Sequence, residues 1–98
     1  MKINFNKNNN TLTVALNGRL DTTTAPDLES FLAENFNGSG SLVIDCEKLL
    51  YVSSAGLRVL LAAQKKMQKI GSMKVTGVCE DVMEVFEMTG FADILVIE

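Results

Sequence analysis

The chain has 98 residues, of which 47% are hydrophobic and 21% are charged, and its formal net charge is −3. This length predicts one domain with one core. The acidic balance argues against partners such as nucleic acid or an anionic membrane surface, because both attract basic proteins. No apolar run reaches the ~20 residues of a membrane span, and "MKINFNKNNN" at the N-terminus lacks the apolar core of a signal peptide. We therefore expect a cytoplasmic protein without membrane insertion.

Two residue types restrict the chemistry of this sequence. Histidine is absent, which excludes histidine-based triads and imidazole metal ligands. Cys46 and Cys79 are too few for a zinc site, and each lies in or beside an apolar stretch, which predicts buried, free thiols. We expect neither a metal nor a cofactor.

The first twenty residues predict a β-hairpin. Ile3 and Phe5 alternate with polar residues, as in a half-buried strand, and the three asparagines at 8–10 favour a turn. The second strand is expected to end at Asn17-Gly18. It places three apolar residues on one face: Leu12, Val14 and Leu16.

A helix is expected after the hairpin. Thr24, followed three residues later by Asp27, resembles a capping box, and Pro26 suits a first turn because its missing N–H is not needed there. Gly38 is expected to end this helix. Its predicted inward face consists of Leu28, Phe31, Leu32 and Phe36.

The rest of the chain alternates strands and helices. The stretch "SLVIDC" (41–46) has the continuous apolar character of a strand buried on both faces. A helix from about Ser54 to Ile70, a strand over 72–79, a helix from about Glu80 to Met88 and a last strand over 93–98 follow. The inward faces of these two helices are expected to present Leu57, Leu60, Leu61 and Met67, and Val82, Val85 and Phe86.

The element order β-β-α-β-α-β-α-β predicts an α/β fold. Its sheet is expected to be mixed and mostly parallel, with an N-terminal antiparallel hairpin and about three helices. In such sheets, functional sites gather at the carboxyl ends of the parallel strands. The turn at Ser53-Ser54 leaves the carboxyl end of the predicted central strand.

Two adjacent hydroxyls mark that turn. We expect Ser54 to be the N-cap of the long helix, since serine accepts a hydrogen bond from an unpaired N–H of the first turn. One cap needs only one hydroxyl, however, and Gly56 lowers the steric bulk, which lets another molecule approach. A helix N-terminus also tolerates added negative charge, so the turn is compatible with capping alone or with phosphorylation.

Two carboxylates flank predicted loops. Asp21, in "GRLDTTT", is either an Asx residue that stabilises its own turn or a group that a partner contacts. Asp45 is expected to end its strand and to organise the following loop as a hydrogen-bond acceptor. A third interpretation, catalysis with Ser54 as nucleophile, lacks an activating base at a recognisable spacing. We expect a protein that is not an enzyme.

Three stretches carry a family resemblance: "GRLD", "SLVIDCEKLLYVSSAGLRVLL" and "VFEMTGFADILVI". In this order and spacing the chain resembles, over residues 1–98, a STAS domain of the anti-sigma factor antagonist family. The resemblance implies a bacterial, cytoplasmic regulator of transcription that acts by partner switching. In that family the unphosphorylated antagonist binds an anti-sigma factor serine kinase and so frees the sigma factor. Phosphorylation of a serine at the start of the central helix ends the binding, and a phosphatase, here expected to be of the PP2C type, reverses it.

The family motif can be placed on this chain residue by residue. The family turn reads Asp-Ser-Ser-Gly-Leu or Asp-Ser-Thr-Gly-Leu, and alignment of the Gly-Leu pair puts the modified serine at Ser54. Ser53 stands where the family carries aspartate and is the second choice of acceptor. The resemblance also implies that Asp21, which matches the aspartate of the family's G-x-L-D motif, lies near the partner-binding surface. We predict that this surface combines the turn at 21–24 with the turn at 53–58, two loops expected at the same end of the sheet, with Leu57 supplying apolar anchoring beneath them. Its expected residues are Asp21, Thr22, Thr23, Ser53, Ser54, Gly56, Leu57 and Arg58.

One alternative function keeps the fold. The chain would then be a constitutive STAS interaction subunit of another complex, for example an ABC-type lipid transporter, and Ser54 would have no switch role. The sequence leaves open which sigma factor is controlled and whether the protein forms a homodimer.

Overall fold

The structure, a computed structural model, describes residues 1–35 and 40–98. Phe36 and Gly38, which were expected to complete the first helix and end it, lie outside these residues. The elements are β1 (Lys2–Asn8), β2 (Thr11–Leu20), α1 (Ala25–Asn35), β3 (Gly40–Val52), α2 (Ser54–Ile70), β4 (Gly71–Thr76), α3 (Glu80–Thr89) and a 3-10 turn (Phe91–Asp93).

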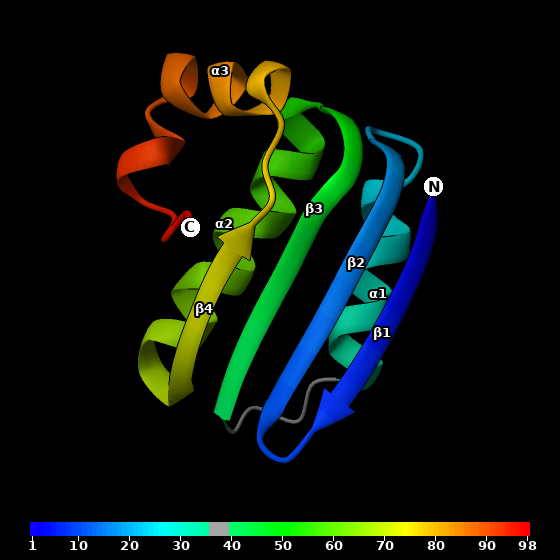
Figure 1. Ribbon diagram of the computed structural model, residues 1–98, viewed down its shortest axis with the longest axis vertical. Coiled ribbons are helices and arrows are strands. Elements are labelled where there is room, and N and C mark those ends of the chain that lie inside the picture. The colour runs from blue at the N-terminus through cyan, green and yellow to red at the C-terminus, as the bar shows by residue number, and fades with distance from the viewer. Residues whose placement is uncertain (36–39) are drawn as a thin grey trace.

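The four strands form one sheet in the order β1-β2-β3-β4 (Figure 1). β1 and β2 pair antiparallel, whereas β2–β3 and β3–β4 pair parallel, which confirms the predicted mixed sheet with its N-terminal hairpin. Asn9 adopts a φ of 55°, the left-handed conformation that asparagine tolerates, and this closes the hairpin. β2 continues past its predicted end at Asn17-Gly18 as far as Leu20.

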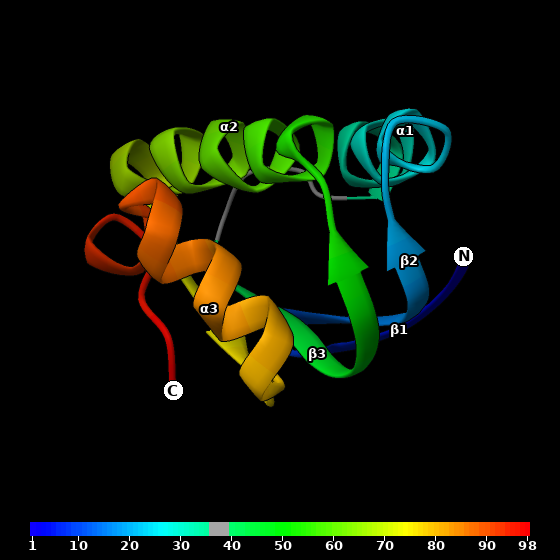
Figure 2. The ribbon, with the colours of Figure 1, turned by 90° about the horizontal axis from the view of Figure 1, so that it is seen from above.

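Two layers make up the molecule. α1 and α2 lie side by side on one face of the sheet (Figure 2), and α3 lies beyond the end of β4 (Figure 1). The core fills the space between the layers, and its largest fully buried side chains include Leu16, Leu20, Leu28, Ile44, Leu60 and Phe86. On the opposite face of β3, Val43 and Asp45 are half-buried, so the prediction of a strand buried on both faces is wrong. Both long helices pack on the same face, which leaves the other face to water.

β3 is twice as long as the stretch that predicted it. It runs 13 residues and passes through Asp45, which therefore does not end the strand as expected. Its register with β2 shifts twice, between Ala15 and Asn17 and between Gly18 and Arg19. At the first shift, Asp45 Oδ1 accepts a hydrogen bond from the Glu47 N–H at 3.0 Å. β3 thereby bends away from the plane of the sheet toward α2 (Figure 2).

The C-terminal segment differs from the predicted strand over 93–98. Gly90, with a φ of 81°, ends α3 in the left-handed conformation, and the 3-10 turn follows directly. Only the last few residues reach β4, where the Val75 N–H donates to the Val96 carbonyl at 2.8 Å and the Glu98 N–H to the Val75 carbonyl at 2.9 Å. In place of the predicted strand there is a single parallel bridge, between Val75 and Ile97. The first half of the predicted strand, residues 93–95, belongs to the turn that follows α3.

The helices largely keep their predicted bounds and inward faces. α2 spans the predicted residues, and α3 extends one residue beyond Met88. Leu61 and Val85 are half-buried, and Phe31 and Leu32 of α1 are half-buried as well. The predicted inward residues that are fully buried are Leu28, Leu57, Leu60, Met67, Val82 and Phe86. Within 1–35 and 40–98, no helix has both the length and the apolar character that crossing a membrane requires.

Candidate functional site

The two turns singled out by the sequence meet at the carboxyl ends of β2 and β3. The last paired residues of these strands are Leu20 and Val52. One residue later, the Ser53 N–H donates a hydrogen bond to the Leu20 carbonyl at 2.8 Å. The turn at 21–24 and the start of α2 are therefore neighbours at one end of the molecule (Figure 2).

Ser53, not Ser54, is the N-cap of α2. Ser53 has the extended backbone of a cap residue, with φ −96° and ψ 174°, and its Oγ accepts a hydrogen bond from the Gly56 N–H at 3.3 Å. The prediction that Ser54 caps the helix is wrong, because β3 runs to Val52 and makes Ser53 the last residue outside the helix. Ser54 is the first helical residue, and it is exposed.

Asp21 organises the turn in which it lies. Its Oδ1 accepts hydrogen bonds from the Thr23 N–H at 3.0 Å and the Thr24 N–H at 3.1 Å, as an Asx turn requires. The backbone bond from Thr24 is the largest influence that lowers the pKa of Asp21; further bonds from Thr24 and Thr23 and the Arg19 charge add to it, and desolvation opposes it. The structural interpretation of Asp21 is confirmed, and its contact with a partner stays a prediction.

The expected capping box at the start of α1 has a different form. The Thr24 hydroxyl turns back, accepting from the Asp21 N–H at 2.9 Å and donating to the Arg19 carbonyl at 2.7 Å. The Asp27 N–H bonds instead to the Thr24 carbonyl at 3.0 Å. The threonine thus fastens the turn to the end of β2.

The remaining predicted partner-binding residues divide by burial. Thr22, Thr23 and Arg58 are exposed, whereas Gly56 is buried and Leu57 retains only 4% of its exposure. A Cβ atom on Gly56 would lie against Leu20, so the space at this glycine is already filled by the protein itself. Leu57 packs in the core and does not offer a surface anchor. Any influence of these two residues on binding would act through the position of α2.

Three residues that the sequence analysis did not select lie beside this site. The Arg19 guanidinium lies 4.2 Å from the centre of the Tyr51 ring, and its Nε lies 3.9 Å from Asp21 Oδ2. Leu50, next to Tyr51, is 69% exposed. In the sequence Leu50 belongs to the run "KLLYV", whose apolar letters do not indicate which side chains point outward. The register shift in β3 decides this.

The two cysteines have different environments. Cys46 is fully buried, as predicted, and burial raises the pKa of its thiol to about 12. Cys79 is only half-buried and stands at the N-cap of α3, where its Sγ donates to the Leu49 carbonyl at 3.5 Å. The prediction of a buried thiol is therefore confirmed for Cys46 and wrong for Cys79.

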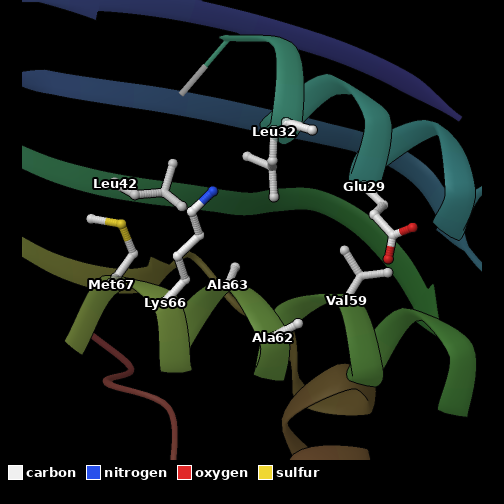
Figure 3. Close-up of a pocket in the computed structure, with 9 residues that line it drawn as sticks. Glu29, Leu32, Leu42, Val59, Ala62, Ala63, Lys66 and Met67 are labelled. Carbon is white, nitrogen blue, oxygen red and sulfur yellow. The ribbon is translucent and has the colours of Figure 1, made fainter. Parts of the chain in front are cut away.

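A separate apolar cleft lies between α1 and α2 (Figure 3). Its volume is about 170 Å³, which is below the ~300 Å³ typical of small-molecule sites, so we assign no ligand to it. It shares no residue with the two turns. Its lining consists of Glu29, Leu32, Ala33, Leu42, Val59, Ala62, Ala63, Lys66 and Met67.

Comparisons with known proteins identify the family. Residues 2–98 match the model of the STAS domain. The chain is 35% identical over 96 residues to BtrV of Bordetella bronchiseptica, which is named as an anti-sigma factor antagonist; the match covers 96% of this chain and 83% of BtrV. It is 29% identical to the anti-sigma-B factor antagonist of Bacillus subtilis, with coverage of 97% and 88%.

A solved structure shows the same fold. The anti-sigma factor antagonist SpoIIAA in its unphosphorylated form superposes with a TM-score of 0.79 at 14% identity, covering 99% of this chain and 88% of that chain. Its phosphorylated form, from Bacillus, gives a TM-score of 0.72 at 14% identity, with coverage of 99% and 91%. With the domain match over residues 2–98 and the relative at 35% identity, the chain belongs to the STAS domain proteins of the anti-sigma factor antagonist family.

Proposed function

We propose that this chain is an anti-sigma factor antagonist that acts as one STAS domain over residues 1–98. Its unphosphorylated form binds an anti-sigma factor serine kinase in the cytoplasm and frees the sigma factor. Phosphorylation of Ser54 ends the binding, and a PP2C-type phosphatase restores it. The protein is a binding partner and a substrate in this cycle, not an enzyme.

The position of Ser54 carries this proposal. Because Ser53 caps α2, the Ser54 hydroxyl is not needed for the helix start, and it stands exposed on the first turn. The Asp21 turn lies beside it, held by the hydrogen bond from Ser53 to Leu20. An accessible hydroxyl beside an ordered polar turn suits both the entry of a kinase active site and the formation of a regulated interface. The names of the curated relatives, which are anti-sigma factor antagonists, support the same function.

The fold is expected to tolerate the phosphate. Phosphorylation adds about −1.5 to −2 charges. At a helix N-terminus, negative charge is favoured by about 0.3–1 kcal/mol. Arg58 is exposed and lies four residues after Ser54 on the same helical face, where it can pair with the phosphate. The effect of the modification should therefore appear in partner binding rather than in folding.

The test uses the recombinant serine kinases of the anti-sigma factor class from the source organism, one at a time. Wild type, Ser53→Ala and Ser54→Ala are incubated with each kinase and ATP, and fragmentation mass spectrometry locates the phosphate. We expect phosphate on wild type and on Ser53→Ala, and none on Ser54→Ala. Phosphate that persists in Ser54→Ala and disappears in Ser53→Ala would move the switch by one residue.

A binding measurement completes the test. Calorimetry should detect a complex of the unphosphorylated protein with one of these kinases and a weaker complex after phosphorylation. A protein that binds none of the kinases and accepts no phosphate would instead fit the alternative of a constitutive STAS subunit, for example in an ABC-type lipid transporter. The two variants identify the acceptor serine, and the binding of the wild type to a kinase decides between the two functions.

A further inference from the structure

The second register shift in β3 turns Leu50 outward. The pairing with β2 steps from Gly18↔Leu49 directly to Arg19↔Tyr51, so Leu50 is the extra residue of a β-bulge. Leu49 and Val52 are buried, while Leu50 is 69% exposed and Tyr51 is 38% exposed between them. Bulges occur beside functional sites, where they redirect side chains. This bulge lies near the end of β3, shortly before Ser53 and Ser54 in the sequence.

The neighbours of Leu50 form a defined surface rather than an isolated apolar side chain. The Arg19 guanidinium lies over the Tyr51 ring at 4.2 Å, within the range of a cation–π interaction. Arginine and tyrosine are residue types that protein interfaces favour, and Leu50 adds exposed apolar area beside them. We call Arg19, Leu50 and Tyr51 the bulge surface.

Charges on either side of the bulge surface define what would fit it. Arg19 belongs to it, and Arg58 is exposed on the first turns of α2. Asp21 already accepts the hydrogen bonds of its own turn and lies near Arg19. On the other side, α3 begins next to Leu49, through the bond from Cys79, and its first turn carries Glu80 and Asp81. A partner whose carboxylates face the arginines keeps them away from α3, whereas the reversed orientation would bring them against Glu80 and Asp81. The charges therefore favour one orientation of docking.

We infer that the bulge surface is the apolar part of the kinase-binding site, with Leu50 in the role that the sequence analysis expected of Leu57. The matching partner surface is an apolar socket whose rim carries carboxylates facing Arg19 and Arg58. This inference rests on the proposed function, because it takes the anti-sigma factor kinase as the occupant. The bulge surface adjoins the Asp21 turn, because Arg19 Nε lies 3.9 Å from Asp21 Oδ2, and its β3 residues come shortly before Ser53 and Ser54 in the sequence.

An acidic rim gives the phosphorylation switch its direction. A phosphate on Ser54 would repel the rim carboxylates and would also occupy Arg58, which lies one helical turn further on. Both effects weaken the complex, and neither requires a change in the fold. A basic rim would be attracted by the phosphate, and binding would then increase.

The experiment compares Leu50→Ser with Val96→Ser in calorimetric titrations against the kinase that binds the wild type. Val96 is 52% exposed and lies in the C-terminal segment, so it controls for the loss of an exposed apolar side chain elsewhere. We expect Leu50→Ser to weaken binding at least tenfold, equivalent to ~1.4 kcal/mol, and Val96→Ser to bind as the wild type does. Arg58→Glu should also weaken binding, whereas Arg58→Lys, which keeps the positive charge, should retain most of the affinity of the wild type. Thermal unfolding of each variant checks that the fold is retained.

The outcomes separate this inference from the function on which it rests. If the wild type binds the kinase and Leu50→Ser binds equally well, the inference is wrong and the proposed function stands. If Arg58→Glu strengthens binding, the acidic rim is wrong. If the wild type binds no kinase of this class, both proposals are wrong.

Discussion

Gly56 at the start of α2 packs directly against Leu20 at the end of β2. A Cβ atom on Gly56 would stand 2.7 Å from Leu20 Cγ and 2.9 Å from the Leu20 carbonyl oxygen, closer than real Cβ contacts allow. The glycine therefore lets the helix approach the strand, and it fixes the distance between the two turns of the site.

This contact predicts the effect of Gly56→Ala. Alanine in a helix is favoured over glycine by up to ~1 kcal/mol, but overpacking of a filled site costs about 1–3 kcal/mol. We expect a net loss in the free energy of unfolding, measured by urea denaturation. Ala62→Gly, at an exposed position of the same helix on the edge of the α1–α2 cleft, reports mainly the propensity difference. A Gly56→Ala protein more stable than the wild type would show that Leu20 can move aside.

The two serines at the start of α2 should differ in their contribution to stability. Ser53 accepts the hydrogen bond of the cap, so Ser53→Ala should lower the free energy of unfolding by about 0.5–2 kcal/mol. Ser54 is exposed on the helix, and Ser54→Ala should change it by less than about 0.5 kcal/mol. Urea denaturation of both variants measures the difference. Equal losses in the free energy of unfolding would mean that both serines contribute to the N-cap of α2.

The Asp21 turn should become less stable in acid. Hydrogen bonds from Thr24 and Thr23 hold the pKa of Asp21 below its unfolded value, so the stabilisation is present above the unfolded pKa, about 3.9, and is lost as the pH falls through the folded pKa. Asp21→Asn keeps an acceptor oxygen but carries no charge. We expect the stability advantage of the wild type over Asp21→Asn to shrink on acidification, in urea denaturation curves recorded at several pH values.

A matched variant separates the turn from the charge. Asp21→Ala removes the acceptor as well and should be less stable than Asp21→Asn at neutral pH. A gap between wild type and Asp21→Asn that stays constant with pH would contradict the lowered pKa.

The thiols should react at different rates. Cys46 is fully buried with a pKa of about 12, so almost no thiolate forms at neutral pH, and a thiol reagent should label it only after denaturation. Cys79 is half-buried and should react measurably in the native protein. Mass spectrometry of Cys46→Ala and Cys79→Ala, each with one remaining thiol, assigns the rates. Rapid native labelling of Cys46 would contradict its burial.

Periodicity predicted most of the fold because burial on one face leaves a regular pattern. Leu12, Val14 and Leu16 alternate and lie in a buried row of β2, and the spacing of Leu57, Leu60 and Met67 places them in the core beneath α2. The spacing breaks down in β3, where Cys46, Leu49 and Val52 are buried at intervals of three. Register shifts cause this change, and they depend on how two strands pair, which the letters of one strand do not contain.

The sequence was enough to predict the parts of the site that depend on local chemistry. It was not enough for the parts that depend on the register between β2 and β3. Both turns follow from polar residues after predicted strands, and the structure places them together. Serine is a good N-cap at either position, so the composition of the turn could not distinguish Ser53 from Ser54. The choice depends on the residue at which β3 ends. The exposure of Leu50 also depends on register, because Leu50 is the extra residue of β3 opposite the step from Gly18 to Arg19 in β2.

The unequal lengths of the strands have a consequence for motion. β4 pairs with β3 only as far as Asp45↔Thr76, whereas β2 accompanies β3 to Val52. Residues 42–45 of β3 therefore pair with a strand on both sides, whereas Lys48, Leu49, Tyr51 and Val52 pair with β2 alone. Amide hydrogen exchange should be faster in the second group, because its opening breaks fewer bonds than global unfolding. The end of the sheet that carries Ser54 can thus loosen and close again while the centre of the molecule stays folded.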